Sequence, residues 1–270
     1  MWQWPMVGLL LLLGVVLPGR MQNIIKDGEP SQGVRDSLHR NGEGMTPRRA
    51  LMTGLAGSVG VGNIAGVACA LAAGGPGAVF WMWVSGVLGM GTAFAEAYWA
   101  SRNPGRGAEG YIRAAGFPKG AKLFCAGCVL ASLGMGGMAQ SNAAGDALVT
   151  LGLPRWGAAV FLGAAALFLA GKKLSAAGKV TEVLVPVMAA VFLLLCGGVL
   201  CRFWDRIIPA LCSIVAAAFG LRPCIGGVAG FGIAAALRQG VTRGVFTHEA
   251  GLGTGPFAYG CCRGENPCVL

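Results

Sequence analysis

The chain has 270 residues, of which 55% are hydrophobic and only 12% are charged, and its mean hydropathy is +0.65. This composition is unusual for a soluble domain, and the apolar residues form long blocks rather than amphipathic stripes. The net charge of +10 does not indicate a nucleic-acid-binding protein, because the basic residues lie between the apolar blocks and not along one face. We therefore expect an all-α membrane protein with a single polytopic domain over residues 1–270.

The first membrane span is predicted at residues 2–17, with Trp2 and Trp4 as interfacial anchors. A secretory signal is the competing interpretation, but no basic residue precedes the apolar run and no small-residue cleavage site follows it. Polar or basic loops are expected at residues 18–49, at residues 101–122 and around Lys172, Lys173 and Lys179. Between these loops, five more spans are predicted at about residues 50–73, 78–100, 123–148, 154–171 and 180–200, the last with a kink at Pro186.

The second span contains the run from Gly57 to Asn63, GSVGVGN. Its three glycines each weaken a helix by about 1 kcal/mol relative to alanine, and Ser58 and Asn63 bring polar groups to membrane depth. Backbone that leaves the helix at this depth must face protein or a water-lined cavity. Broken helices of this kind hold the substrate and the coupling ion in secondary transporters, so the run predicts a transporter with its site at this break.

A seventh apolar segment covers residues 207–237 and is too long for one straight crossing. Arg222-Pro223 and Gly226-Gly227 interrupt it, which predicts a second broken helix. Counted from the second span, the two interrupted helices are the first and the sixth. That spacing predicts an inverted-repeat transporter with about seven spans present. Residues 50–200 would form the first five-helix repeat, and residues 207–270 the first broken helix of an incomplete second repeat with its following loop.

The basic residues predict the orientation of the chain. The loops after the first, third and fifth spans carry fourteen Lys or Arg residues, whereas the loops after the second, fourth and sixth spans carry three. Because cytoplasmic loops are enriched in Lys and Arg, the N-terminus is expected outside.

Several runs, in order along nearly the whole chain, resemble the alanine or glycine:cation symporter family. They are TPRRALMTGLAGSVGVGNIAGVA (46–68), GGPGAVFWMWVSGVLGM (74–90), AQSNAAGDAL (139–148), GKVTEVLVP (178–186) and GVTRGVFTHEAGLGTGPFAYG (240–260). The resemblance implies a LeuT-like fold, a plasma (inner) membrane location, and sodium-coupled uptake of a small neutral amino acid, alanine or glycine.

The chain departs from the family pattern in three places. Thr247 and His248 stand where the family usually has serine and asparagine, and residues 107–112 replace the usual Gly-Gly-Pro-Met-Tyr-Tyr. Family members also continue for several spans beyond the position of Leu270. Two interpretations stay open: part of a working symporter, or a truncated non-transporting membrane protein or assembly subunit that lacks its second half.

A zwitterionic amino acid needs donors for its carboxylate and acceptors for its ammonium group. Backbone N–H groups at the start of the second half of the broken helix, where the helix dipole favours an anion, would supply the donors. Asn63 and Gln140 are the strongest side-chain candidates, with a purely structural role in helix packing as the alternative. The predicted substrate-binding residues are Gly60, Gly62, Asn63, Gln140, Ser141, Gly227, Gly230 and Phe231.

The predicted ion-coupling residues are Ser58, Val59 and Glu96, because intramembrane carboxylates and broken-helix carbonyls suit a cation. For Glu96, gating is the alternative to ion coupling. Asn142 is an even choice between substrate contact and helix packing, and Thr53 is expected to bond to its own helix. Asp146 and Glu182 lie near span ends and are expected to be solvated or paired, while Glu249 is expected to cap a helix or lock a loop.

Other chemistries are less well supported by the sequence. Cys125 and Cys128 form a C-x-x-C inside an apolar span, with no second pair and no nearby histidine, so neither a disulfide framework nor a zinc site is predicted. Residues 60–65 fit G-x-G-x-x-A, but no strand precedes them, so a dinucleotide site is rejected. No nucleophile–base pair is visible, so an enzyme is not expected. The expected partners are the amino acid, sodium and membrane lipid, with no nucleic acid and no cofactor.

Overall fold

The structure is a computed structural model that describes residues 47–103, 107–171, 174–220 and 232–259, together with positions 5, 7–9, 12–17 and 19. Every regular element in these ranges is a helix, which confirms the expected all-α class for this part of the chain. Positions 7–9 and 12–17 of the predicted first span are helical, and the rest of that span lies outside the described residues.

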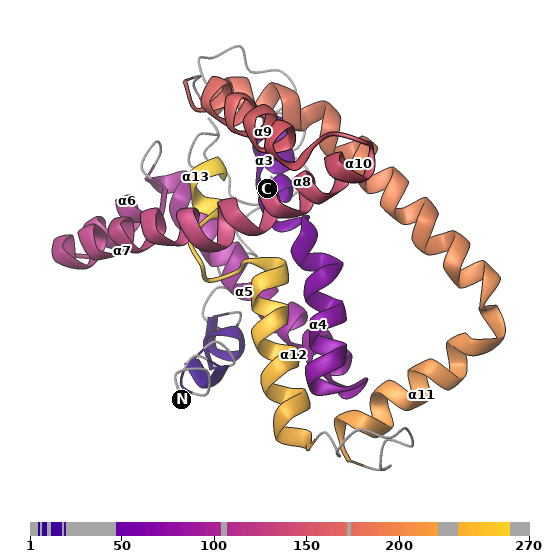
Figure 1. Cartoon of the computed structure of the whole chain (residues 1–270). Helices are drawn as coiled ribbons and strands as arrows, with labels where there is room; N and C mark the ends of the chain where they lie inside the picture. The colour runs from indigo at the N-terminus through magenta and orange to yellow at the C-terminus, as the bar shows by residue number, and fades with distance from the viewer. Residues whose placement is uncertain are drawn as a thin grey trace.

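The predicted second span is interrupted at the glycine run. Helix α3 (Pro47–Ser58) ends before Gly60, a single 3₁₀ turn η1 follows (Val61–Asn63), and α4 (Ala65–Gly74) continues the segment. Gly60 is extended, with φ −149° and ψ −163°. The two halves of the segment are bent by 54°. The bend is visible where α3 passes into α4 (Figure 1).

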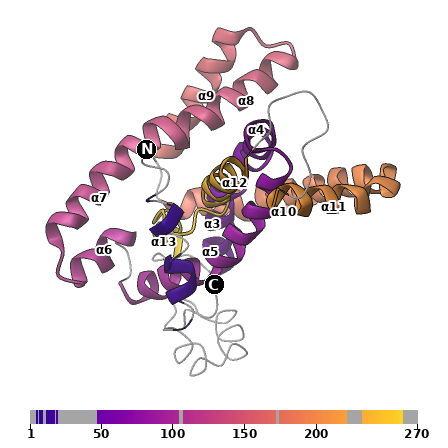
Figure 2. The same cartoon turned by 90° about the horizontal axis from the view of Figure 1, so that it is seen from below.

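The best-packed part of the molecule is formed by α4, α5 (Gly77–Arg102) and α12 (Ile233–His248) (Figures 1 and 2). Their backbones approach closely because glycines face the neighbouring helix. A Cβ atom on Gly240 would lie 2.4 Å from the carbonyl oxygen of Ala78, and one on Gly244 would lie 2.7 Å from Cβ of Ser85. Small residues allow this kind of packing between membrane helices.

The predicted loop at residues 101–122 is in part wrong. It contains α6 (Gly107–Ala114), in which Glu109 pairs with Arg113 one turn later, and the start of α7 (Pro118–Ala131), where Pro118 occupies the first turn. A short helix with charges at i and i+4 reads as a polar loop when only hydropathy is considered. A π-helical stretch (Ser132–Met138) joins α7 to α8 (Ala139–Thr150) within the predicted fourth span.

The remaining helices are α9 (Arg155–Ala170), α10 (Leu174–Arg202), the 3₁₀ turn η3 (Trp204–Arg206), α11 (Ile207–Ala218) and α13 (Gly255–Tyr259). Lys179 lies inside α10 rather than in the predicted loop, because this helix extends beyond its apolar part. The helix also runs on through Pro186. The interruption predicted at residues 222–230 lies outside the described residues, between α11 and α12.

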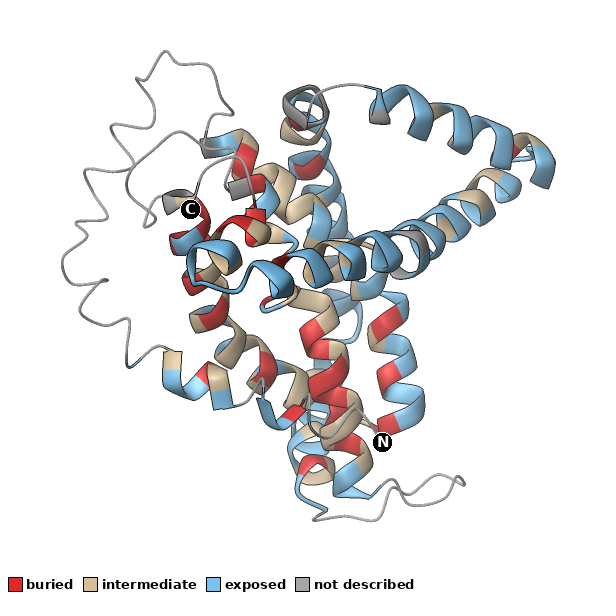
Figure 3. Ribbon diagram, turned by 90° about the vertical axis from the view of Figure 1, so that its left-hand side faces the viewer, coloured by how far each residue is buried: buried red, intermediate tan, exposed pale blue. Residues whose placement is uncertain are grey.

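Two described helices, Gly77–Ala100 and Gly178–Arg202, are long and apolar enough to cross a membrane, and the bent pair α3–α4 makes a third candidate. Buried residues gather along the central helices, whereas the long outlying helices are exposed (Figure 3). The total of seven spans and the five-helix repeat stay predictions.

Candidate functional site

The break in the second span and the fourth span meet at one point. The backbone N–H of Val61 donates a hydrogen bond to Oε1 of Gln140, with an N···O distance of 3.3 Å. The amide of Gln140 also covers Gly60, where a Cβ atom would lie only 2.6 Å from Nε2. Leaving the helix frees the Val61 amide, and the glycine makes room for the side chain that accepts from it.

Asn63 is the most conspicuous polar group of the break. Its side-chain Oδ1 is buried and has no hydrogen-bond partner within the described part of the chain. A buried acceptor without a partner costs about 1–3 kcal/mol, so such groups usually indicate a ligand or water position. Helix α4 starts two residues later, so its first backbone N–H groups, which have no partner within the helix, follow Asn63 closely in the sequence.

Three of the predicted residues bond within their own helix. The hydroxyl of Ser58 lies 3.4 Å from the carbonyl oxygens of Gly54 and Leu55, and the hydroxyl of Ser141 donates to Met138 O at 3.2 Å. The N–H of Val59 likewise bonds to Leu55 O at 2.7 Å. Gly62 and Asn142 are exposed, and neither is brought into contact with Gln140 by a described bond. The predicted Gly227, Gly230 and Phe231 lie outside the described residues.

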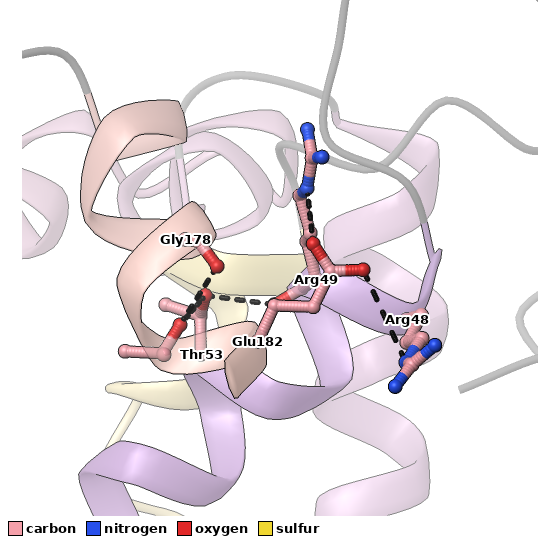
Figure 4. Close-up of polar contacts among 6 residues, drawn as sticks. Arg48, Arg49, Thr53, Gly178 and Glu182 are labelled. Atoms are coloured by element: carbon pink, nitrogen blue, oxygen red, sulfur yellow. Dashed lines mark hydrogen bonds and ion pairs between the residues drawn. The ribbon is translucent and has the colours of Figure 1, made fainter. Parts of the chain in front are cut away.

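The first half of the broken helix is fixed to α10 by polar contacts at one end (Figure 4). Arg49 donates to Oε2 of Glu182 at 2.5 Å. One turn along, the hydroxyl of Thr53 donates to its own helix at Arg49 O, as expected for this residue, and lies 3.1 Å from the hydroxyl of Thr181. Glu182 is therefore paired, in agreement with the prediction, but its partner was not predicted because 133 residues separate the two.

The other carboxylates also have described partners. Asp146 accepts from Arg155 at 3.1 Å, on the exposed turn between α8 and α9. Glu96 on α5 accepts from the backbone N–H of Gly253 at 2.9 Å. Glu249 ends α12 in the left-handed region (φ 54°), and its side chain accepts from the hydroxyl of Thr254 at 2.6 Å. Its predicted role at the end of a helix thus agrees with its position.

The contact between Ser85 and His248 was not predicted from the sequence. Nε2 of His248 lies 3.1 Å from the hydroxyl of Ser85, and its Nδ1 accepts the N–H of Ala250 at 3.1 Å. Nδ1 therefore carries no hydrogen, and Nε2–H donates to Ser85. The departure of residue 248 from the family pattern was the available signal, but no sequence feature pointed to Ser85.

No group of three His, Cys, Asp or Glu side chains among the described residues is arranged to hold a metal ion. Cys125 and Cys128 are free thiols on α7. The polar groups at the break are main-chain amides, the side-chain amides of Gln140 and Asn63, and hydroxyls, while the carboxylate of Glu249 lies beside Gly57 at the end of α3.

Comparison with known proteins gives a consistent result. A sequence model described as the sodium:alanine symporter family matches residues 1–269. The sodium/alanine symporter AgcS of Methanococcus maripaludis is 39% identical over 81% of this chain and 51% of its own length. The sodium/proton-dependent alanine carrier protein of Bacillus sp. strain PS3 is 30% identical over 78% of the chain and 48% of its own. The probable sodium/glutamine symporter GlnT of Bacillus subtilis is 31% identical over 99% of the chain and 58% of its own.

The chain thus spans about half the length of the curated relatives it matches. Their family consists of transporters and not of enzymes, in agreement with the apolar helices described above. Because the match extends over essentially every residue, the chain is a membrane protein that belongs to the sodium:alanine symporter family.

Proposed function

We propose that this chain supplies the substrate-binding half of a secondary active symporter of LeuT-like fold, which takes up a small neutral amino acid together with sodium by alternating access. The observation that carries the proposal is the 54° break with its polar groups: the amide of Gln140 over Gly60, and the oxygen of Asn63, which has no partner among the described residues. Interrupted helices with freed backbone groups are the usual binding element of such carriers.

The chemistry of the break favours a neutral zwitterion. The side chains of Ser58, Asn63 and Gln140 are uncharged, so these three residues can match the charges of the substrate only by partial charges. The N-terminal end of α4 favours the carboxylate, and the Asn63 oxygen can accept from the ammonium group. Gln140 fills the space above Gly60, which favours alanine or glycine over a larger side chain such as that of glutamine.

The coupling ion is proposed to be sodium, as the family and the names of the relatives indicate for other members. The main-chain carbonyls that end α3, around Ser58 and Val59, are the proposed oxygen donors, because the C-terminal end of a helix favours a cation. From the distribution of Lys and Arg, we propose that the N-terminus lies outside and that α3 begins on the cytoplasmic side.

The test is uptake of radiolabelled alanine into proteoliposomes that contain the complete reading frame in which these 270 residues occur. An inward sodium gradient is expected to drive accumulation, and replacement of external sodium by potassium to abolish it. Unlabelled glycine should compete better than unlabelled glutamine. Equal accumulation with sodium and with potassium would contradict sodium coupling. Alanine binding without uptake in either salt would favour the non-transporting alternative.

Two variants separate the site from the scaffold. Asn63→Ala removes the unpartnered oxygen and is expected to raise the KM for alanine at least tenfold, since one hydrogen bond to a charged group is worth about 1.5–3 kcal/mol. Asn103→Ala, which removes an amide that donates to Trp99 O at the end of α5, is the matched control and should leave KM within twofold. An unchanged KM in Asn63→Ala would place the substrate elsewhere.

A further inference from the structure

Two of the packed groups among the described helices have few direct contacts with each other and are joined at the break. One group consists of α4, α5 and α12, which pack on one another along their lengths. The other consists of α3 and α10, which are connected through the contacts of Arg49 and Thr53. Within the described residues α3 packs mainly on α10 and α13, and only slightly on α12. Gly60 lies between α3 and α4, so it is the point about which α3 could turn if the indirect connections between α3 and the first group were released.

The segment that follows α12 bridges this gap. We call residues Glu249–Thr254, which lead directly into α13, the strap. The strap starts at a left-handed residue that turns the chain sharply away from α12. The carboxylate of Glu249 then lies beside the last turn of α3, with Oε2 3.6 Å from where a Cβ of Gly57 would be. Beyond the strap, α13 packs on α3, α5 and α6.

Glu96 is the point at which the strap is fixed to α5. Its Oε1 accepts the N–H of Gly253 at 2.9 Å, 157 residues away in the sequence. Gly253 has a φ of +75°, and a Cβ on it would meet the ring of Phe124 at 2.6 Å, so the backbone itself is pressed against α7.

We propose that Glu96 is a positioning residue that holds the strap closed over the first half of the broken helix, and that it does not bind the coupling ion. While Glu96 holds Gly253, α13 and Glu249 keep α3 against the α4–α5–α12 group. Release of this bond frees α3 to turn about Gly60. The inference rests on the proposed function for its consequence in transport, but the bond itself can be tested without transport.

The test compares two substitutions of one residue by hydrogen–deuterium exchange of the purified protein in detergent. Glu96→Ala removes the acceptor, and exchange in peptides that cover residues 249–257 and 50–58 is expected to rise roughly tenfold, which corresponds to about 1.4 kcal/mol. Glu96→Gln keeps an oxygen acceptor in the same place and is expected to exchange within twofold of the parent. Asp205→Ala, which removes an exposed carboxylate that pairs with its neighbour Arg206 on η3, is the control.

Transport kinetics then distinguish a positioning residue from an ion ligand. If Glu96 is a positioning residue, Glu96→Gln retains the sodium KM and the maximal rate, while Glu96→Ala changes the maximal rate and leaves the sodium KM within twofold. A sodium KM raised tenfold or more in Glu96→Gln would overturn the proposal in favour of ion binding. Unchanged exchange in Glu96→Ala would overturn it as well. If the parent protein does not transport but the exchange pattern is as expected, the proposed function is wrong and the positioning role of Glu96 is supported.

Discussion

The side chain of Gln140 accepts a hydrogen bond from the backbone N–H of Val61 at 3.3 Å, so the fourth predicted span is joined to the break of the second. A break in an apolar helix leaves main-chain donors that lipid cannot satisfy. Here one of those donors is satisfied by an amide from a helix 79 residues later in the chain. No described residue accepts a hydrogen bond from the N–H groups of the same amide, so it can stabilise the break and contact a substrate at once.

Gln140→Ala is expected to remove both roles. The Val61 amide loses its acceptor, and alanine uptake by the complete carrier should fall at least tenfold in kcat/KM, because one hydrogen bond to a charged substrate group is worth about 1.5–3 kcal/mol. Gln140→Glu keeps the acceptor for Val61 but loses the N–H donors. If Gln140→Glu gives more folded protein than Gln140→Ala but equally little uptake, the N–H donors of Gln140 contact the substrate. Full uptake in Gln140→Glu would limit the residue to a structural role.

Gly60→Ala is expected to impair the site far more than Gly62→Ala. At residue 60 the added Cβ would lie 2.6 Å from Nε2 of Gln140, so this side chain must leave its position, whereas at residue 62 no atom lies within 4 Å. Both substitutions raise helix propensity by a similar amount. The affinity for alanine, measured by binding to the purified protein, should therefore fall in Gly60→Ala alone. Equal losses in the two variants would mean that helix propensity, and not the space for Gln140, controls the break.

Glu182→Gln tests the connection between α3 and α10. The carboxylate is 23% exposed and its partner Arg49 is 31% exposed, so the pair is partly shielded from water. A loss of about 1 kcal/mol in the free energy of unfolding is expected, at the upper end of values for solvent-accessible pairs. Asp146→Asn breaks the more exposed pair with Arg155, and a loss below about 0.5 kcal/mol is expected there. Thermal unfolding in detergent compares the stability of the two variants. A larger loss in Asp146→Asn than in Glu182→Gln would contradict the proposed role of Glu182 in connecting α3 to α10.

The break could be predicted from the sequence because its cause is local. Glycines and an asparagine in one apolar run weaken the helix whatever its neighbours are, and residues 57–63 show this composition directly. The same holds for the apolar lengths of α5 and α10. The short α6 was not predicted, because its charged residues Glu109 and Arg113 make the segment polar, although their ion pair supports the helix.

Long-range partners could not be predicted in this way. The sequence predicts gating or ion coupling for Glu96, because a carboxylate in an apolar span is a functional candidate by default, but it does not indicate a partner. In the structure Glu96 faces a backbone amide from a loop 157 residues away. Glu182 likewise gave no sequence signal for Arg49, since nothing in the composition around either residue specifies which helices become neighbours. The sequence around a residue indicates which types of contact it can make, but its partner depends on how the helices pack in three dimensions.

Gly240→Ala tests the close packing of α12 on α5. A Cβ at this position would lie 2.4 Å from the carbonyl oxygen of Ala78 and 2.6 Å from Cβ of Trp81, and backbone cannot move aside as a flexible side chain can. Overpacking of this kind costs about 1–3 kcal/mol, so a clearly lower thermal unfolding temperature is expected. Gly86→Ala on α5, where no atom lies within 4 Å, is the matched control. It should be neutral or slightly stabilising, because alanine favours the helix by roughly 1 kcal/mol over glycine. A Gly240→Ala protein as stable as the control would mean that α12 does not pack this closely on α5, and the pivot at Gly60 would then lack its fixed side.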